Sequence, residues 1–223
     1  MIAYDYHGIM VHIPKTGGTS IFQFFCDMYG VGRVEGKKKI FNMGRYCDPN
    51  FDHNRAIDYT ENNVVSQEIW EKFFKWSVVR DPVKRFVSFY TWMRGEPNGR
   101  TFANMMSLDE FVDIFEERLW NVEAGPGQPQ GYNFVRPQHE FIIHDGQIMV
   151  DMILQTERLS SHFEHLRKTL NLPDGELGHV NKSGGRVKKT LKITQRQVEF
   201  VEKLYKEDFE LHEKISGESP WFK

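Results

Sequence analysis

A loop with the residue types of a phosphate site lies near the start of the chain. An apolar run over residues 9–13 stops at Pro14, and a second apolar pattern begins at Ile21. Between them stand Lys15, Thr16, Gly17, Gly18, Thr19 and Ser20. This order predicts a strand, a tight loop and a helix, which together direct backbone N–H groups at one point and form an anion site. The glycines allow close approach, and the lysine and hydroxyls add charge and donors.

A second segment, FFKWSVVRDPVKRFVSFY at residues 73–90, has the residues for another phosphate contact. Its apolar first half predicts a buried strand that ends at Arg80, and Pro82 suits the first turn of a new helix. Ser88 falls inside that helix. Arginine offers a bidentate fork and serine a hydroxyl donor, so Arg80 and Ser88 together are suited to hold a phosphate group.

The common nucleotide loop reads GxxxxGK[ST], with its lysine after the last glycine, whereas here the lysine comes first. The string HIPKTGGTS at residues 12–20 instead resembles the 5′-phosphosulfate loop of sulfotransferases that use PAPS (3′-phosphoadenosine 5′-phosphosulfate). It looks closest to the carbohydrate branch, which includes the heparan sulfate 2-O and chondroitin or dermatan sulfotransferases. Arg80 and Ser88 resemble the 3′-phosphate site of that family.

Later segments extend the resemblance over residues 8 to 214: RPQHEFI at 136–142, HVNKSGGR at 179–186 and KLYKEDFELHEK at 203–214. In related enzymes a loop like HVNKSGGR closes over the nucleotide. The resemblance therefore implies that Asn181, Lys182 and Ser183 belong to the nucleotide pocket. It also implies PAPS as co-substrate, PAP (adenosine 3′,5′-bisphosphate) as product, and an acceptor hydroxyl, on a carbohydrate, as the attacking group.

The roles within the site follow from the same resemblance. The residues from Lys15 to Ser20 would cradle the phosphosulfate, and Lys15 would neutralise the leaving oxygen. A base with a pKa near working pH favours histidine. Related enzymes place a catalytic histidine between the two phosphate motifs, often as HxTA or HLSA, and His53 in DHNRA occupies that interval. Asn54 and Arg55 depart from the pattern, and Asp52 is the alternative, carboxylate base.

Composition limits the class of protein. The chain has 223 residues, 14% of them aromatic. This length and composition predict a single folded domain over residues 1–223, although two small domains also fit. A net charge of −2 disfavours a nucleic-acid binder. Two cysteines and nine histidines match no zinc spacing, so we expect no metal. The chain shows no signal peptide and no apolar run near the ~20 residues of a membrane span, which predicts a cytoplasmic protein.

Apolar periodicity alternates between strands and helices. The predicted strands cover residues 8–13, 74–80 and 148–154, and the predicted helices cover 19–29, 64–73, 82–93, 108–120, 159–170 and 194–209. Ser107 with Glu110 predicts a capping box for the helix at 108. Alternating elements predict an α/β three-layer sandwich with a central, mainly parallel sheet and a P-loop-like phosphosulfate loop at the carboxyl ends of its strands.

Two other functions stay open on the sequence. One is a small-molecule kinase with a variant phosphate loop, which would need magnesium carboxylates. The other is a module that binds the nucleotide without catalysis.

Overall fold

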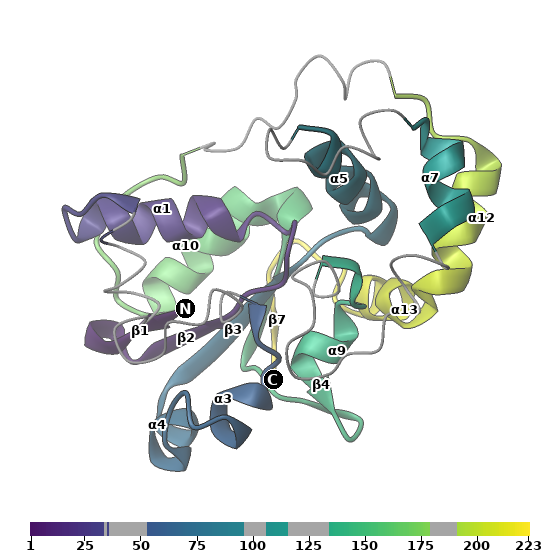
Figure 1. Cartoon of the computed structure of the whole chain (residues 1–223). Helices are drawn as coiled ribbons and strands as arrows, with labels where there is room; N and C mark the ends of the chain where they lie inside the picture. The colour runs from purple at the N-terminus through teal and green to yellow at the C-terminus, as the bar shows by residue number, and fades with distance from the viewer. Residues whose placement is uncertain (34, 36–52, 96–105, 116–133, 179–190) are drawn as a thin grey trace.

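A computed structural model describes residues 1–33, 35, 53–95, 106–115, 134–178 and 191–223. Their centre is a five-stranded sheet in the order β1-β2-β3-β6-β7 (Figure 1). Its strands are β1 (Ile2–Ala3), β2 (Gly8–Val11), β3 (Phe74–Val79), β6 (Met152–Gln155) and β7 (Trp221–Phe222). The three central strands pair in parallel, and both edge strands are antiparallel. The α/β class with a mainly parallel sheet is thereby confirmed.

Helices cover both faces of the sheet, as Figure 1 shows. Helices α1 (Gly18–Met28) and α10 (Leu159–Thr169) lie on one face, and α3 (Asp58–Glu61), α4 (Gln67–Lys72) and α9 (His139–Ile142) lie on the other. Trp76 and Leu154 point toward α1 and α10, while Ile9 and Ile153 belong to the opposite core. The central strands are apolar on both faces because both are buried.

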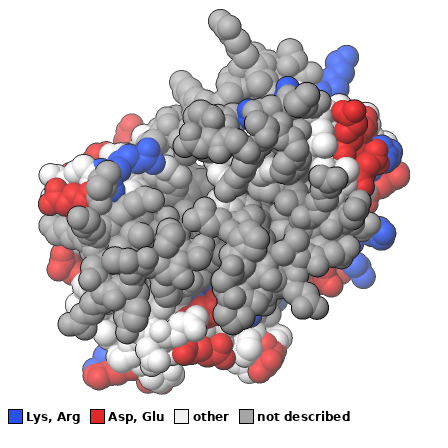
Figure 2. Space-filling view, in the orientation of Figure 1, with Lys and Arg blue, Asp and Glu red and all other residues white. Residues whose placement is uncertain are grey.

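A third apolar cluster lies beyond the end of β3, where the chain enters α5 (Pro82–Gly95). It joins α5 to α7 (Leu108–Phe115) and α12 (Gln195–Leu204), and α13 (Lys206–Lys214) follows directly. Phe86, Phe111 and Phe115 pack ring to ring within it. Figure 2 shows both signs of charge along the α7–α12 edge, where Arg196 pairs with Asp109 and Asp113.

The strand predicted over residues 148–154 is wrong as a single element. Ile148 belongs to a small hairpin, β5 (Gln147–Ile148) paired with β4 (Ile143–His144), and the sheet strand β6 starts only at Met152. Between them the Asp151 carboxylate accepts a hydrogen bond from the Lys75 amide, and the Asp151 amide donates to the Lys75 carbonyl. Asp151 is thus tied to β3 at a point between β5 and β6.

The helix predicted over residues 194–209 is also two helices. The chain leaves helical geometry at Tyr205, with φ −122° and ψ 37°, between α12 and α13. The Tyr205 hydroxyl donates to the Val135 carbonyl at 2.7 Å. Apolar periodicity continues through this break, so the pattern alone does not reveal it.

The capping box predicted for the helix at 108 agrees with the structure; that helix is described as far as Phe115, and the helix predicted over 64–73 is shorter, Gln67–Lys72. The Ser107 hydroxyl accepts from the Glu110 amide, and the Glu110 carboxylate accepts from the Ser107 amide, which is the expected capping box at the start of α7. The short elements are η1 (Tyr4–Tyr6) and η4 (Thr156–Arg158). Within the part of the chain that is described, every helix is too short or too polar to cross a membrane.

Candidate active site

The loop after β2 is held by its carbonyl groups. Three consecutive carbonyls each accept a side-chain donor from another part of the fold. The pairs are Arg85 Nε to Pro14 O at 3.1 Å, Arg80 Nη1 to Lys15 O at 3.1 Å, and Thr156 Oγ1 to Thr16 O at 2.5 Å. In a trans peptide the N–H points opposite to the C=O. The amides of Lys15, Thr16 and Gly17 are therefore directed away from these donors, as in an anion-binding nest.

The backbone of the loop is unusual at two positions. Lys15 has φ 69° and Gly17 has φ 95°, both in the left-handed region. Glycine adopts this conformation freely, but for lysine it costs about 1–2 kcal/mol. The Thr16 hydroxyl is buried and donates to the Ile13 carbonyl at 2.8 Å, so this side chain shapes the loop rather than facing a ligand. Strain kept in place by surrounding bonds is common at functional sites.

Gly18 begins α1 and lies directly against His12. A Cβ added at Gly18 would lie 2.2 Å from His12 Nε2 and 2.3 Å from His12 Cδ2. Only a residue without a Cβ fits beside this ring. Thr19 and Ser20 follow in the first turn of α1, where the Ser20 amide already donates to the Gly17 carbonyl.

Arg80 brings the second predicted motif to the first. It follows β3 directly, and its guanidinium contacts the Lys15 carbonyl, so the two motifs share one site. Burial lowers the pKa of Arg80, and the charges of Glu157 and Asp81 oppose that shift. The guanidinium nevertheless remains charged. Its Nε is buried and has no hydrogen-bond partner among the described residues.

Ser88 lies on α5 and is buried. Arg85, Ser88 and Trp92 are spaced i, i+3 and i+7, which places them on one side of the helix. Arg85 contacts the loop at Pro14, and the Lys15 Nζ lies 5.2 Å from the centre of the Trp92 ring. Ser88 lies between Arg85 and Trp92 along this side of the helix. Of the predicted set, Lys15 and Arg80 are in direct contact, and the place of the Ser88 hydroxyl in the site stays a prediction.

His53 lies beside the loop, although it is 41 residues from His12 in sequence. Its Nδ1 is 3.1 Å from the His12 carbonyl oxygen, and its ring centre is 4.5 Å from that of His12 and 5.3 Å from that of Phe134. A carbonyl can only accept, so this bond requires a proton on His53 Nδ1. In the neutral ring the lone pair is then on Nε2, the nitrogen that a general base needs.

Phe134 and Trp92 form an aromatic wall between His53 and Lys15. Their rings stack at 4.5 Å with an angle of 7° between planes. His53 meets the Phe134 edge of this wall and the Lys15 ammonium meets Trp92. His53 and the Lys15 ammonium are thus linked through two stacked aromatic rings.

A cleft of about 520 Å³ opens next to the glycines of the loop. It is lined by Gly17, Ser20, residues 156–161, Leu177 and Gly178. Gly178 is followed by the segment 179–190, so Asn181, Lys182 and Ser183 lie outside the described residues. Asp52 lies outside them as well.

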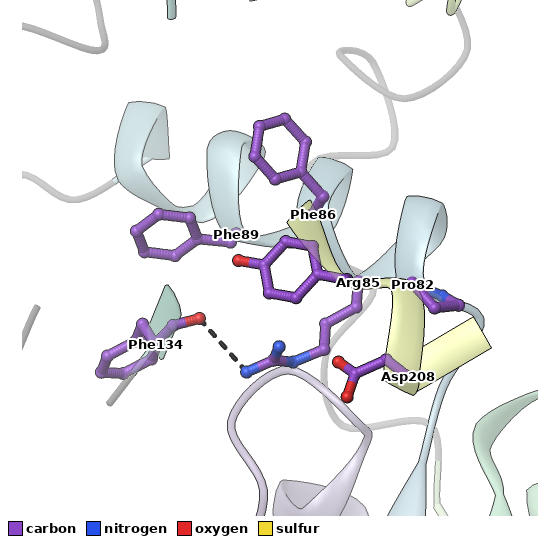
Figure 3. A pocket seen from close by; sticks show the side chains of 7 residues that line it. Pro82, Arg85, Phe86, Phe89, Phe134 and Asp208 are labelled. Atoms are coloured by element: carbon purple, nitrogen blue, oxygen red, sulfur yellow. Dashed lines mark hydrogen bonds between the residues drawn. The ribbon is translucent and has the colours of Figure 1, made fainter. Parts of the chain in front are cut away.

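Arg85 has a supporting role that the sequence did not reveal. It is buried, and its Nη2 donates to the Phe134 carbonyl while its Nε donates to the Pro14 carbonyl. Figure 3 shows its guanidinium between Phe134 and Asp208. Burial lowers the pKa of Arg85, and the acidic groups of Tyr205 and Asp208 oppose the shift. Thr156, Gln138 and Asp208 were also missed, because their contacts join segments far apart in sequence.

An anion-binding loop between a parallel strand and a helix, met by an arginine from the next strand, defines a phosphate-binding α/β protein. A family model described as "Sulfotransferase family" matches residues 1–214. The chain belongs to the sulfotransferase family, and it is therefore an enzyme, a transferase that uses PAPS. No curated protein and no solved structure matches it. Within the described residues, no cluster of three or more His, Cys, Asp or Glu side chains is arranged to hold a metal ion.

Proposed function

We propose that residues 1–223 form a single sulfotransferase domain that moves a sulfuryl group from PAPS to a hydroxyl of a carbohydrate acceptor. The observation that carries this proposal is that the carbonyls of Pro14, Lys15 and Thr16 all accept side-chain donors, which leaves the amides of Lys15, Thr16 and Gly17 directed away from those donors. The likeness of HIPKTGGTS to the carbohydrate branch supports the acceptor class.

In the proposed reaction the acceptor oxygen forms a bond to sulfur while the bond from sulfur to the 5′-phosphate oxygen breaks. The acceptor proton goes to His53 Nε2, and the electron pair of the broken bond leaves on the phosphate. Lys15 neutralises the charge that develops there. Positioning and charge stabilisation supply most of the rate in such in-line transfers.

The nucleotide is assigned by the same reasoning. The loop from Lys15 to Ser20 holds the 5′-phosphosulfate, and Arg80 with Ser88 holds the 3′-phosphate. The cleft beside Gly17 and Ser20 is large enough to take the adenosine, which Asn181, Lys182 and Ser183 would then cover. Buried, positively charged arginine near the loop favours a ligand with several negative charges.

The test is transfer of labelled sulfate from PAPS into a panel of sugars, lipids and phenols. We expect the His53→Gln variant to lose turnover by about 10²–10⁴-fold, the range of general-base catalysis, while it keeps its affinity for PAP. His165→Gln is the matched control, because this histidine on α10 is exposed and is not one of the residues that line the cleft.

Two outcomes contradict the proposal. If only ATP with magnesium protects the wild type against unfolding, and PAP without magnesium does not, the protein is a kinase. If His53→Gln keeps full turnover, His53 is not the base.

A further inference from the structure

A buried carboxylate on α13 is tied to the chain that precedes α9. Asp208 is only 1% exposed. Its Oδ2 accepts from the Gln138 amide at 2.7 Å, and its Oδ1 accepts from the His139 amide and from His139 Nδ1, both at 2.9 Å. A buried charge is tolerated only when such donors satisfy it. Asp208 therefore fixes the backbone at Gln138 and His139.

The Gln138 side chain in turn holds the backbone of Arg80. Its Oε1 accepts from the Arg80 amide at 2.9 Å, and its Nε2 donates to the Arg80 carbonyl at 2.8 Å. Strand β3 ends at Val79, so these two bonds replace the pairing that a further strand residue would make. Gln138 is itself 1% exposed, which leaves little freedom for its amide.

The chain of contacts ends at the phosphate loop. Asp208 fixes Gln138, Gln138 fixes the backbone of Arg80, and the Arg80 guanidinium meets the Lys15 carbonyl. Each link is a direct hydrogen bond between residues that lie 58 to 70 positions apart in sequence.

We propose that Gln138 and Asp208 are positioning residues for Arg80, and that they set the affinity of the enzyme for the 3′-phosphate of its nucleotide. This rests on the proposed function, in which Arg80 binds that phosphate. A guanidinium forks onto a phosphate only in a narrow range of orientations. Because the base of its side chain is clamped on both backbone groups, Arg80 meets the ligand already oriented.

The experiment compares two ligands that differ by this one phosphate. The affinities of PAP and of adenosine 5′-phosphate are measured by titration calorimetry without metal for the wild type, Gln138→Leu and Asp208→Asn. We expect PAP to bind about tenfold more weakly to both variants, a change typical of residues coupled through one hydrogen-bond network. Adenosine 5′-phosphate should bind with its wild-type affinity. Asp113→Asn, a surface carboxylate paired with Arg196, is the matched control.

An Arg80→Ala background distinguishes positioning from general support of the fold. If Gln138 acts through Arg80, Gln138→Leu has no further effect on PAP affinity once the arginine side chain is gone. Wild-type PAP affinity in a folded Gln138→Leu variant would overturn the proposal. An equal loss for both ligands, or a loss that persists without Arg80, would overturn it as well.

The design distinguishes a failure of the variants to fold from a failure of the proposed function. If Asp208→Asn fails to fold, as circular dichroism would show, Gln138→Leu decides the question, and Gln138→Glu, which keeps an acceptor for the Arg80 amide, gives a milder variant. If the wild type binds PAP no better than adenosine 5′-phosphate, the assignment of Arg80 in the proposed function fails first.

Discussion

Substitution of Gly18 by alanine tests how tightly the loop is built. The new Cβ would lie 2.2 Å from His12 Nε2, more than 1 Å short of the 3.4 Å at which ordinary contact begins. A third neighbour, Met10 Cε at 3.1 Å, is the end of a flexible side chain and can move by a few tenths of an ångström. The His12 ring has less freedom, because it packs against His53 at 4.5 Å.

The expected cost is about 1–3 kcal/mol of unfolding free energy, the usual range for overpacking. The measurement is urea denaturation of Gly18→Ala against the wild type, with PAP affinity as a second readout. Gly32→Ala is the matched control, since nothing lies within 4 Å of a Cβ at that position. Displacement of His12 should also weaken PAP binding, because its ring lies against Gly18 at the start of α1.

A double variant decides whether the clash is the cause. In a His12→Ala background the obstacle is gone, and Gly18→Ala should then be neutral or stabilise by up to about 1 kcal/mol, since alanine restricts the unfolded chain. The sign of the effect is thus expected to reverse. The same cost in both backgrounds would refute the steric explanation, and no cost in the native background would refute the geometry itself.

Two further predictions concern pH. Burial alone would lower the pKa of His139, but its hydrogen bond to Asp208 and the charge of that group prevail and raise it. The stability from this pair is therefore complete below the ordinary histidine pKa of 6.5 and is lost as pH rises through the raised value. The difference in unfolding free energy between wild type and His139→Gln should shrink as the pH rises above the ordinary pKa, and a constant difference would contradict the pairing. His162 behaves oppositely: burial lowers its pKa, and its Nδ1 accepts from the Gln155 amide. The stability that neutral His162 contributes is complete above the ordinary histidine pKa and falls as pH drops below it. In urea titrations, His162→Gln should therefore lose less unfolding free energy than the wild type between about pH 7 and 5. An equal loss would count against a neutral, buried His162.

The sequence predicts well what is encoded by neighbours in the chain. The loop from Lys15 to Ser20 and the strand that ends at Arg80 each combine apolar periodicity, glycine or proline, and charged residues within a short window. Those local signals locate β2, α1, β3 and α5 to within two residues. They also bring Lys15 and Arg80 to the same end of the sheet, because parallel strands share a carboxyl edge.

The sequence predicts poorly what depends on distant pairing. Gln138 contacts Arg80 across 58 residues, Asp208 contacts Gln138 across 70, and Thr156 contacts Thr16 across 140. No local pattern marks a glutamine that completes a strand or a threonine that holds a loop carbonyl. The break at Tyr205 is hidden for the same reason, because the hydrogen bond of its hydroxyl to Val135 comes from another part of the chain.

The three hydrogen bonds to carbonyls of the loop after β2 link the stability of this enzyme to its nucleotide affinity. Arg80, Arg85 and Thr156 come from separate elements, and each bond that shapes the receptor also joins two parts of the fold. The entropy of ordering this loop is given up during folding, so the loop itself needs little rearrangement when a nucleotide binds to it. Thermal resistance and nucleotide affinity are consequently linked: substitutions that loosen these anchors lower both together, and neither property can drift freely from the other.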